Sequence, residues 1–492
     1  MSDRQFLNFI GGAWVEGSGG DPIPSLNPAD ARQIHGYATN SGADDVAAAV
    51  AAAEEALASW RATPAPVRGR ICRDAARLLE ERAEEYGRIL TLEEGKLFAE
   101  AAGEVQKGAT LVEWFSGEAR RMNGETVPSE IPNTFAYTTR VPVGVVGLIT
   151  PWNFPLAIPA WKIAPALVAG NTVVIKGAEQ TPWTTECVIR AFVEAGVPAG
   201  VLNLVQGGPT AGKAVVEHPA IEAISFTGST EVGHAIYARG AALGKRVQCE
   251  LGGKNPLILL ADGDVDMAVA AAAKGGFGST GQRCTATSRA IVERSVLEEF
   301  VEKLAAAAAA VVPGDGMRPE VTMGPSVDAD QHGKVLEYLQ VGRDEGVEVV
   351  CGGSRATGEG LDHGYFTQPT VFLANRDHRV AREEIFGPVI SVVAVDSFDE
   401  AIDVANAVEY GLTSSLYTRD VNKVFQYADR VETGMLHVNS PTIGGEAQLP
   451  FGGMKKTGVG PREMGTQAID FFTEWKTVYV DYGGGMRGGN LY

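Results

Sequence analysis

The amino-acid sequence predicts an α/β protein with two doubly wound parallel sheets. Short runs rich in Val and Ile alternate with segments whose apolar residues recur at helical spacing, first across residues 138–242 and again across 255–395. Alternation of this kind is typical of parallel sheets covered by helices. The chain has 492 residues, which is too long for one ordinary core, so two or three domains are expected.

The first half of the chain predicts two helices followed by one sheet. Apolar positions at helical spacing, with Glu and Arg between them, predict amphipathic helices over 44–60 and 67–92. A β-branched stretch punctuated by glycine then runs over 138–150. The strands predicted after it cover 173–176, 202–205 and 223–226, and the predicted helices cover 158–169, 184–195, 212–217 and 232–242.

The second half predicts another sheet of the same kind. Its predicted strands cover 255–260, 288–292, 347–351, 370–373 and 389–395, and its predicted helices cover 265–276 and 297–311. The segment 468–480 is rich in aromatic and β-branched residues, which favours an exposed strand that pairs with another subunit. The glycine-rich tail 483–490 predicts a loose end.

Composition and charge restrict the function classes. Hydrophobic residues make up 45% and charged residues 21%, as in globular soluble proteins. A formal net charge of −19 argues against nucleic-acid and anionic-membrane partners, since both need a basic patch. Five widely spaced cysteines without a C-x-x-C pair, and seven scattered histidines, suggest neither disulfides nor a metal site. With no signal peptide or apolar span in view, the sequence predicts a cytoplasmic protein.

One cysteine stands in an unusual setting. Cys284 lies in Gly-Gln-Arg-Cys-Thr-Ala (281–286), a run of small and polar residues beside Arg283. The thiolate is the reactive form of cysteine, and a nearby cation or base lowers the cost of ionising it. Cys284 is therefore a candidate nucleophile. Taken alone, these residues are also consistent with Cys284 being a small, buried, apolar residue of the core.

An asparagine follows a predicted strand. Pro-Trp-Asn-Phe-Pro (151–155) comes directly after the β-branched run 145–150, at the end of a strand where open α/β sheets bind ligands. The amide of Asn153, together with the backbone N–H of Cys284, would form an oxyanion hole for attack by the thiol. A proline-framed turn, in which the asparagine bonds its own backbone, is the alternative.

A carboxylate stands at another loop junction, and a hydroxyl-rich turn follows the predicted strand 223–226. Glu250, in Glu-Leu-Gly-Gly-Lys (250–254), is a candidate general base that activates water against a thioester; a surface glutamate before a turn is the alternative. Phe-Thr-Gly-Ser-Thr (226–230) precedes a predicted helix and suits an anion at its N-terminus, although Ser and Thr are also ordinary N-caps. No G-x-G-x-x-G fingerprint is present there; Gly207-Gly208-Pro209 follows the preceding strand.

Seven motifs, taken together, resemble those of the NAD(P)-dependent aldehyde dehydrogenase superfamily across nearly the whole chain. In chain order they are Pro-Trp-Asn-Phe-Pro (151–155), Lys176 with Glu-Gln-Thr-Pro (179–182), Phe-Thr-Gly-Ser-Thr (226–230), Glu-Leu-Gly-Gly-Lys (250–254), Gly-Gln-Arg-Cys-Thr (281–285), Glu-Ile-Phe-Gly-Pro (384–388) and Pro-Phe-Gly-Gly (450–453). Each is weak alone. Their order and spacing make coincidence negligible.

The resemblance implies a mechanism. Cys284 matches the nucleophile that forms a thiohemiacetal and, after hydride transfer to the nicotinamide, a thioester. The other catalytic matches are the oxyanion amide Asn153, the deacylation base Glu250, Lys162 beside the asparagine and the nicotinamide ribose, and the proton-relay carboxylate Glu463. The cofactor matches are Thr150, Pro151, Trp152, Lys176, Glu179, Gly208, Phe226, Gly228, Ser229, Val232, Leu251, Gly252, Gln331, Lys334, Glu384 and Phe386.

Glu179 bears on which cofactor binds. It resembles the acid that holds the adenosine ribose hydroxyls, and a carboxylate there repels a 2′-phosphate, so NAD is favoured with NADP still possible. The sequence departs from the family at Gly177, where a proline usually follows the lysine; without the proline's fixed φ, a looser Lys176 loop is expected.

The substrate is predicted less directly. Arg283 resembles the arginine that holds the distal carboxylate in α-aminoadipic semialdehyde dehydrogenases, and the stretches 154–171 and 281–288 look most like α-ketoglutaric semialdehyde (2,5-dioxovalerate) dehydrogenases. We therefore predict a short semialdehyde bearing a carboxylate, anchored by Arg283 and Ser440. Trp161 stands where succinate-semialdehyde enzymes often have an arginine. An aromatic pocket of Trp114, Phe115, Trp161 and Phe451, for vanillin-like or benzaldehyde-like aldehydes, is the alternative.

Two other classes of function fit the sequence less well. A cysteine hydrolase would need a histidine partner that no motif supplies. A non-catalytic protein on the same fold would not need competent residues at every catalytic position.

The resemblance also implies a domain division. A dinucleotide-binding domain is expected over 1–125 and 147–250, a catalytic domain over 251–450, and oligomerisation segments over 126–146, a β-hairpin, and 466–492, a C-terminal strand. The exposed sheet edge of the hairpin predicts a homodimer or homotetramer.

Overall fold

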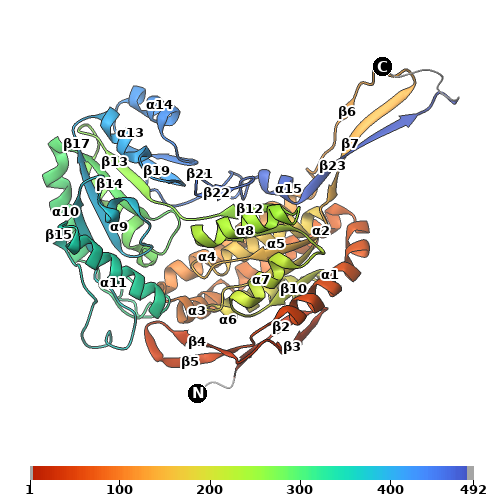
Figure 1. Ribbon diagram of the computed structural model, residues 1–492, viewed down its shortest axis with the longest axis horizontal. Coiled ribbons are helices and arrows are strands. Elements are labelled where there is room, and N and C mark those ends of the chain that lie inside the picture. The colour runs from red at the N-terminus through yellow and green to blue at the C-terminus, as the bar shows by residue number, and fades with distance from the viewer. Residues whose placement is uncertain (1–3, 485–492) are drawn as a thin grey trace.

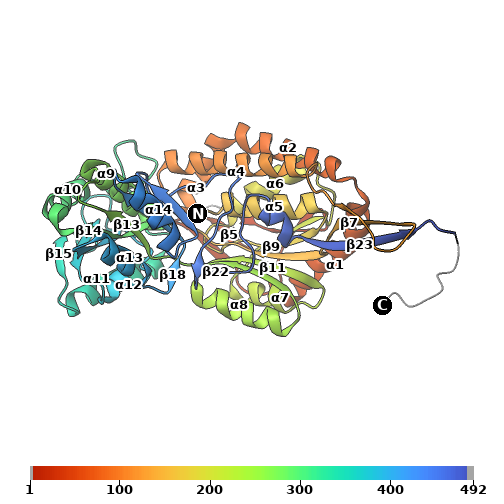
Figure 2. The same cartoon turned by 90° about the horizontal axis from the view of Figure 1, so that it is seen from above.

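The computed structural model describes residues 4–484 and consists of two α/β lobes and a projecting β-arm (Figure 1). The lobe with the N-terminal helices carries the arm (Figure 1). The chain passes between the lobes from β12 (Arg246–Glu250) to β13 (Asn255–Leu259), and β21 (Met454–Lys455) and β22 (Gly458–Val459) lie near this junction. Figure 2 shows the two lobes side by side, with the arm beyond the first. Most of the predicted tail 483–490 lies outside the described residues.

The first lobe holds an eight-stranded sheet in the order β22-β12-β11-β8-β9-β10-β2-β3. Its central strands β8 to β12 run parallel, whereas β2 and β22 are antiparallel to their neighbours. The strands are β2 (Asn8–Ile10), β3 (Ala13–Val15), β8 (Val145–Ile149), β9 (Thr172–Lys176), β10 (Leu202–Val205), β11 (Ile221–Thr227), β12 (Arg246–Glu250) and β22 (Gly458–Val459). The three strands predicted over 173–226 are confirmed.

Helices cover this sheet on both faces. They are α1 (Ala43–Ala62), α2 (Ala65–Glu81), α3 (Ala83–Glu94), α4 (Phe98–Glu118), α5 (Ala157–Ala169), α6 (Pro182–Glu194), α7 (Pro209–Glu217) and α8 (Thr230–Ala242). The prediction of one helix over 67–92 was wrong. Arg82 leaves the helical backbone at φ −104° and ψ 14°, and its N–H bonds three residues back to Leu79, so the chain tightens and divides.

The second lobe holds a seven-stranded sheet in the order β15-β16-β17-β14-β13-β19-β20. All neighbours are parallel except β15, which pairs antiparallel with β16. The strands are β13 (Asn255–Leu259), β14 (Thr287–Glu293), β15 (Glu348–Cys351), β16 (Thr370–Ala374), β17 (Val389–Val395), β19 (Thr413–Tyr417) and β20 (Met435–Val438). The first five were predicted; β19 and β20 were not.

The helices of the second lobe are α9 (Val265–Phe277), α10 (Leu297–Ala309), α11 (Ala329–Asp344), α12 (Arg379–Arg382), α13 (Phe398–Asn406) and α14 (Val421–Arg430), with short 3₁₀ turns at Gly278–Gly281 and Arg294–Val296. Smaller sheets are formed by β1 (Gln5–Phe6), β4 (Ile23–Asn27) and β5 (Asp30–Ala38), and by β18 (Tyr410–Gly411) with β21 (Met454–Lys455).

The arm is a three-stranded antiparallel sheet in the order β23-β7-β6. Its strands are β6 (Thr126–Val127), β7 (Thr134–Pro142) and β23 (Thr473–Asp481). The predicted strand 468–480 was wrong at its start, because Gln467–Phe471 forms helix α15, whose Phe471 is buried in the first lobe. Val145 and Val146, at the end of the predicted hairpin, belong to β8 of the large sheet.

The strand order places the candidate site. The chain builds β8, β9 and β10 outward on one side and then returns to place β11 and β12 on the other side of β8. The switch point therefore lies between β8 and β11, and ligands of open parallel sheets bind outside the carboxyl ends of strands at such a point. Thr150 to Asn153 and Gly228 to Thr230 follow these two strands.

Candidate active site

Cys284 lies on the wall of a cavity of about 480 Å³. A turn in which Ser279, Thr280 and Gly281 all have positive φ leads the chain into this position. The side-chain amide of Asn255, at the start of β13, donates to the carbonyl oxygens of Cys284 and Ala286, both at 2.8 Å. The thiol is thus held at the boundary between solvent and the packed lobe, where a substrate can reach it.

The surroundings of Cys284 disfavour its ionisation. Burial raises the pKa of the thiol, and the negative charges of Glu250 and Glu384 raise it further. These carboxylates shift that pKa because they lie near the sulfur. Burial and these two charges favour the protonated thiol.

The amide of Asn153 faces the loop that carries the thiol. Its Nδ2 donates to the carbonyl oxygen of Gln282 at 3.1 Å, two residues before Cys284, and the side chain is 5% exposed. An amide nitrogen carries two N–H groups. Within residues 4–484 this nitrogen has no second partner, so one N–H is left to stabilise an oxyanion.

Glu250 is the last residue of β12 and is almost fully buried. Burial raises its pKa well above the ordinary value for glutamate, and the nearby charge of Glu463 raises it further. Its Oε1 has no hydrogen-bond partner in the described chain. A buried carboxylate oxygen without a partner is costly, which suits an atom that binds a reacting water.

Lys162 and Glu463 form a buried ion pair behind the cavity. The other carboxylate oxygen of Glu463 accepts from Nε1 of Trp161 at 2.9 Å, while Lys162 also donates to Oγ of Ser225 at 2.7 Å. The chain around Glu463 is tied to the cavity wall by reciprocal backbone bonds with Phe451. Lys162, predicted beside Asn153 and the nicotinamide ribose, thus contacts the predicted relay carboxylate Glu463, and the charge of Glu463 raises the pKa of Glu250.

The strand ends of the first lobe fit a dinucleotide. Helix α8 begins after Ser229, whose side chain does not cap it, so its first N–H groups are open to an anion. At Gly208 a Cβ would meet no atom within 4 Å, which leaves open space beside the start of α7. The Oγ1 of Thr150 is buried without a partner in the described residues. The half-exposed Val232 stands in the first turn of α8.

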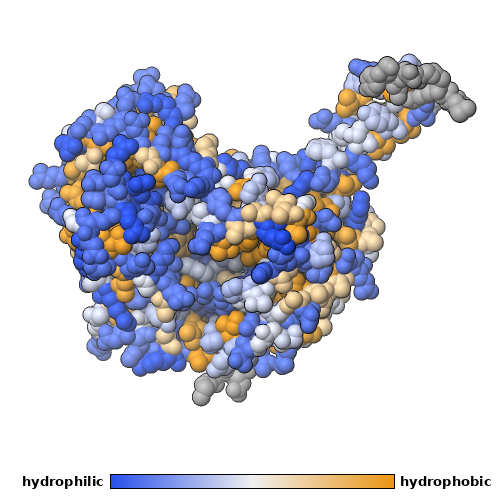
Figure 3. All heavy atoms as spheres, in the orientation of Figure 1, coloured by the Kyte–Doolittle hydropathy of each residue, from blue (hydrophilic) through white to orange (hydrophobic). Residues whose placement is uncertain are grey.

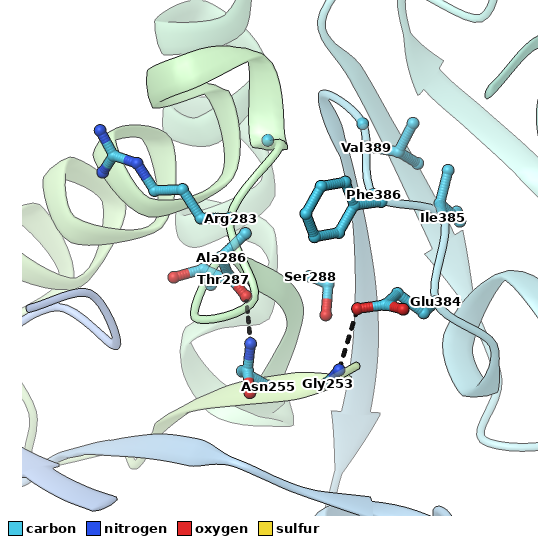
Figure 4. A pocket seen from close by; sticks show the side chains of 12 residues that line it. Gly253, Asn255, Arg283, Ala286, Thr287, Ser288, Glu384, Ile385, Phe386 and Val389 are labelled. Atoms are coloured by element: carbon cyan, nitrogen blue, oxygen red, sulfur yellow. Dashed lines mark hydrogen bonds between the residues drawn. The ribbon is translucent and has the colours of Figure 1, made fainter. Parts of the chain in front are cut away.

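The second lobe supplies the facing wall of this cleft. Glu384 accepts from the backbone N–H of Gly253 at 2.9 Å, and Figure 4 shows its carboxylate and the ring of Phe386 turned toward the same pocket. Phe386, at φ +59°, packs edge-to-face against Trp152 with 5.5 Å between ring centroids. Gln331 holds this turn by donating to the carbonyl oxygen of Phe386 at 2.8 Å.

Several of the predicted cofactor-binding residues are held by close packing and by backbone hydrogen bonds. A Cβ at Gly252 would lie 2.4 Å from the Glu384 carboxylate, so only glycine fits there. The N–H of Gly228 bonds to the carbonyl oxygen of Glu250, and that of Leu251 to Thr457. The ring of Phe226 would clash with any side chain at Gly228. Burial raises the pKa of Glu384, and the positive charge of Lys334 lowers it by a smaller amount.

Gly177 packs closely against α6. A Cβ at Gly177 would lie 2.6 Å from Oγ1 of Thr185. Lys176 pairs with Glu179 at 2.8 Å beside the end of β9, and the lysine is buried. The looser Lys176 loop stays a prediction.

The predicted substrate residues divide into two groups. Arg283, Trp161 and Phe451 line the cavity with Cys284, whereas Ser440 is not among the described residues that line it. Arg283 is already paired with Glu100 at 2.9 Å, and Figure 4 shows its side chain directed away from Glu384. The aromatic pocket was wrong in part: Phe115 is fully buried in the core, and Trp114 packs against that core rather than lining the cavity.

Two basic residues that the sequence reasoning missed also line the cavity. They are Lys107 on α4 and Lys274 on α9. Lys107 donates to the carbonyl oxygen of Gly445, and burial lowers its pKa, whereas the ammonium of Lys274 has no hydrogen-bond or ionic partner among residues 4–484. A signal for Lys274 was present, since it is the one charged residue in the apolar and small-residue run 268–282.

The aldehyde dehydrogenase family model matches residues 14–478. The chain belongs to the aldehyde dehydrogenase family. The chain is therefore an oxidoreductase that acts on aldehydes with NAD(P) as cofactor.

Relatives and a solved structure extend over most of this aldehyde dehydrogenase. It is 44% identical to the α-ketoglutaric semialdehyde dehydrogenase of Bacillus subtilis, over 96% of this chain and 98% of that protein. It is 43% identical to the 2,5-dioxopentanoate dehydrogenase of Saccharolobus solfataricus, over 95% and 97%. The structure of betaine aldehyde dehydrogenase from Staphylococcus aureus in complex with NAD⁺ matches at a TM-score of 0.96 and 32% identity, covering 99% and 97% of the chains.

Residues 4–484 contain neither a membrane-spanning helix nor a cluster of metal ligands. No helix there is both long and apolar enough to span a bilayer. No group of three or more His, Cys, Asp and Glu side chains there is arranged to hold a metal ion.

Proposed function

We propose that this enzyme oxidises a short semialdehyde bearing a carboxylate, with NAD as the preferred cofactor. The observation that carries the proposal is the cavity beside Cys284: Lys107, Lys274 and Arg283 line it, and none of its lining residues is acidic. An anionic group on the substrate would find positive charge there in a partly dehydrated space. Two relatives at 43–44% identity bear the names of dehydrogenases for such semialdehydes.

The chemical steps are assigned to the chain's own side chains. Cys284 loses its proton to bulk solvent and attacks the aldehyde carbon as the thiolate, and Asn153 donates a hydrogen bond to the developing oxyanion. When bound, the nicotinamide supplies the hydride acceptor. Glu250 then takes a proton from the water that hydrolyses the thioester on Cys284, and the buried pair of Lys162 and Glu463 sets the charge around that base.

The anchor for the carboxylate is Lys274, assisted by Arg283 and Lys107. Arg283 already forms an ion pair with Glu100, and Lys107 already donates a hydrogen bond to a backbone carbonyl oxygen. Lys274 is exposed and free of partners in the described chain, so its ammonium can turn toward a ligand without losing an existing bond. Ser440, predicted as a second anchor, contributes its carbonyl oxygen to Ser415.

The cofactor preference is argued from Glu179. Its carboxylate is held by Lys176 beside the end of β9, where an adenosine ribose would lie, and a 2′-phosphate would meet negative charge there. Glu179 remains partly exposed, so NADP is accepted more weakly rather than excluded.

The deciding experiment is an aldehyde panel followed by the absorbance of the reduced cofactor, with NAD and NADP in parallel. The panel contains 2,5-dioxopentanoate, its uncharged five-carbon counterpart pentanal, and benzaldehyde. We expect the highest kcat/KM for 2,5-dioxopentanoate with NAD. Benzaldehyde tests the second candidate, an aromatic substrate, which the rings of Phe154, Trp161 and Phe451 in the cavity favour. A higher kcat/KM for benzaldehyde would replace the carboxylate proposal with the aromatic one.

Oligomerisation, domain division and location complete the proposal. The arm exposes Phe135, Trp475 and Tyr479, and β23 is an edge strand, which supports a homodimer or a homotetramer.

The two large sheets support a dinucleotide-binding domain over 1–125 and 147–250 and a catalytic domain over 251–450, with 126–146 and 466–492 as oligomerisation segments. The free cysteines support a reducing cytoplasm.

A further inference from the structure

Three charged residues at the start of helix α4 connect the two loops that must meet in the reaction. Lys96, Glu100 and Glu104 lie in the segment that leads into α4 or in its first two turns. None of them lines the cavity with Cys284. Their partners lie on the Asn153 loop and on the Cys284 loop. We refer to the three residues as the α4 clamp.

Lys96 and Glu104 hold the loop of Asn153. The Nζ of Lys96 donates to the backbone carbonyl oxygen of Asn153 at 2.7 Å and to Oε2 of Glu104 at 2.7 Å. It also lies 4.3 Å from the ring centroid of Phe154, the next residue. Both charged side chains are 1% exposed. A buried lysine with a carboxylate and a carbonyl as partners restricts that carbonyl closely, because releasing it would leave a charge unsatisfied.

Glu104 fixes the other end of the same loop. Its Oε1 accepts from the backbone N–H of Leu156 at 2.9 Å and from that of Ala157 at 3.1 Å. These are among the first N–H groups of α5, so Glu104 caps the helix from another element. The five residues from Asn153 to Ala157 are therefore gripped at both ends by one ion pair.

Glu100 holds the loop of Cys284. Its Oε1 accepts from the backbone N–H of Ser279 at 2.9 Å and from Nη2 of Arg283 at 2.9 Å. Ser279 and Thr280 have positive φ, which non-glycine residues adopt at a cost, so this turn needs outside support to persist. Arg283 precedes the nucleophile directly.

We propose that the α4 clamp fixes the amide of Asn153 relative to the sulfur of Cys284. Lys96, Glu100 and Glu104 are positioning residues: they touch neither substrate nor cofactor and act through the two loops. The inference rests on the oxyanion role given to Asn153 under Proposed function. A displacement of about 1 Å in such a pair can lower a rate roughly 100-fold, so the clamp should be visible in kcat.

A double-mutant cycle tests the clamp. The variant Lys96→Met/Glu104→Gln removes both charges of the pair, which limits the penalty of leaving one of them buried alone. We expect kcat to fall by roughly 100-fold in the wild-type background and by about twofold or less when Asn153→Ala is already present, because the amide to be positioned is then gone. Alkylation of Cys284 by iodoacetamide should stay within about twofold of wild type, since Glu100 still holds that loop.

Matched variants keep the test decisive. Glu118→Gln changes another buried glutamate of α4, which bonds to Arg121 far from the cavity, and should leave kcat unchanged. Glu100→Gln is the second probe. It keeps the volume of the side chain, removes its charge, and should lower both kcat and the alkylation rate of Cys284. An equal fall in kcat with and without Asn153→Ala would overturn the clamp. A wild-type kcat in Asn153→Ala alone would instead refute the oxyanion role, and the clamp with it.

Discussion

Glu250 illustrates how one buried residue sets the pH dependence of the reaction. Its pKa is raised by burial and by Glu463, so the carboxylate exists only at pH values above that raised pKa. A general base acts when deprotonated, and deacylation should therefore speed up as the pH rises through this pKa and slow as it falls below. The acidic limb of the kcat profile should lie well above the ordinary glutamate pKa.

Glu463→Gln tests the origin of that shift. The substitution removes a negative charge near Glu250 and leaves the positive charge of Lys162 less compensated. Both changes favour the Glu250 carboxylate, so the acidic limb of kcat should move to lower pH in Glu463→Gln. A limb that stays in place, measured over the same buffers as wild type, contradicts the assignment of Glu250 as the group that titrates.

Glu250→Gln separates the two halves of the reaction. Acylation needs Cys284 and Asn153, whereas hydrolysis of the thioester needs the base, so the variant should release about one reduced cofactor per active site and then stall. The steady-state rate should fall by roughly 10²- to 10⁴-fold. Stopped-flow absorbance measures both phases. A variant without a burst would place Glu250 in acylation instead.

Lys274→Met tests the proposed bond between the ammonium of Lys274 and the carboxylate of the substrate. In Lys274→Met the long side chain stays but its ammonium is lost, and one charge-assisted bond of roughly 1.5–3 kcal/mol disappears. We expect kcat/KM for 2,5-dioxopentanoate to fall by roughly 10- to 100-fold, with little change for pentanal. Lys303→Met, on α10 and bonded to Asp266 and Glu299, is the surface control. Equal losses for both aldehydes would exclude Lys274 as the anchor.

At the scale of elements, the loop between β12 and β13 buries a lysine in unfavourable surroundings. Lys254 is 1% exposed, its Nζ has no partner in the described chain, and burial together with the charge of Arg289 lowers its pKa to about 7. The folded state therefore prefers the neutral amine. The stability that this neutral amine supports is present above the unfolded pKa of about 10.4 and is lost as the pH falls toward 7.

Replacing Lys254 by methionine should remove this dependence. At pH 7 to 8 we expect the Tm of Lys254→Met to exceed that of wild type, and the gap should close as the pH approaches about 10. Differential scanning calorimetry over this range gives the result. A gap that is independent of pH would mean that packing, and not the ionisation of Lys254, accounts for it.

The same scale shows why part of the site was predictable. The strands before Asn153 and Gly228 carry local β-branched patterns, and parallel strands bring their carboxyl ends to one edge, so local sequence predicts that these two loops meet. The strand that ends at Glu250, Arg-Val-Gln-Cys-Glu, has no such pattern and was not predicted. Lys96 and Glu104 belong to a helix and its approach, and nothing in their own neighbourhood points to the Asn153 loop. The bond of Lys96 to Asn153 and that of Glu104 to Leu156 depend on tertiary packing.

Substrate residues were harder to predict for the same reason. Trp114 and Phe115 were assigned to the cavity by composition, but the orientation of α4 turns Phe115 into the core and presents Lys107 to the cavity instead. Helical spacing indicates which residues share a face, and not which neighbour that face will meet. Ser440 was likewise close to the cavity in sequence, beside Pro441, but not part of its lining.

At the scale of the whole molecule, the arm cannot bury its own side chains. It projects from the first lobe, and Figure 3 shows apolar residues along its surface. Trp475 is 52% and Tyr479 67% exposed on the edge strand β23, and a small isolated sheet is marginally stable in water. In the proposed oligomer, a second copy of the chain would cover these residues.

Charges on the arm should therefore dissociate the oligomer. In Trp475→Glu/Tyr479→Glu each new carboxylate would have to be buried in the interface without a partner, which costs several kcal/mol per ion. Light scattering after size-exclusion chromatography should show a dimer or tetramer for wild type and a monomer for the variant. Val312→Glu, at an exposed apolar residue after α10, should keep the wild-type mass. A variant that retains the wild-type mass would show that the arm faces solvent and that assembly, where it occurs, uses another surface.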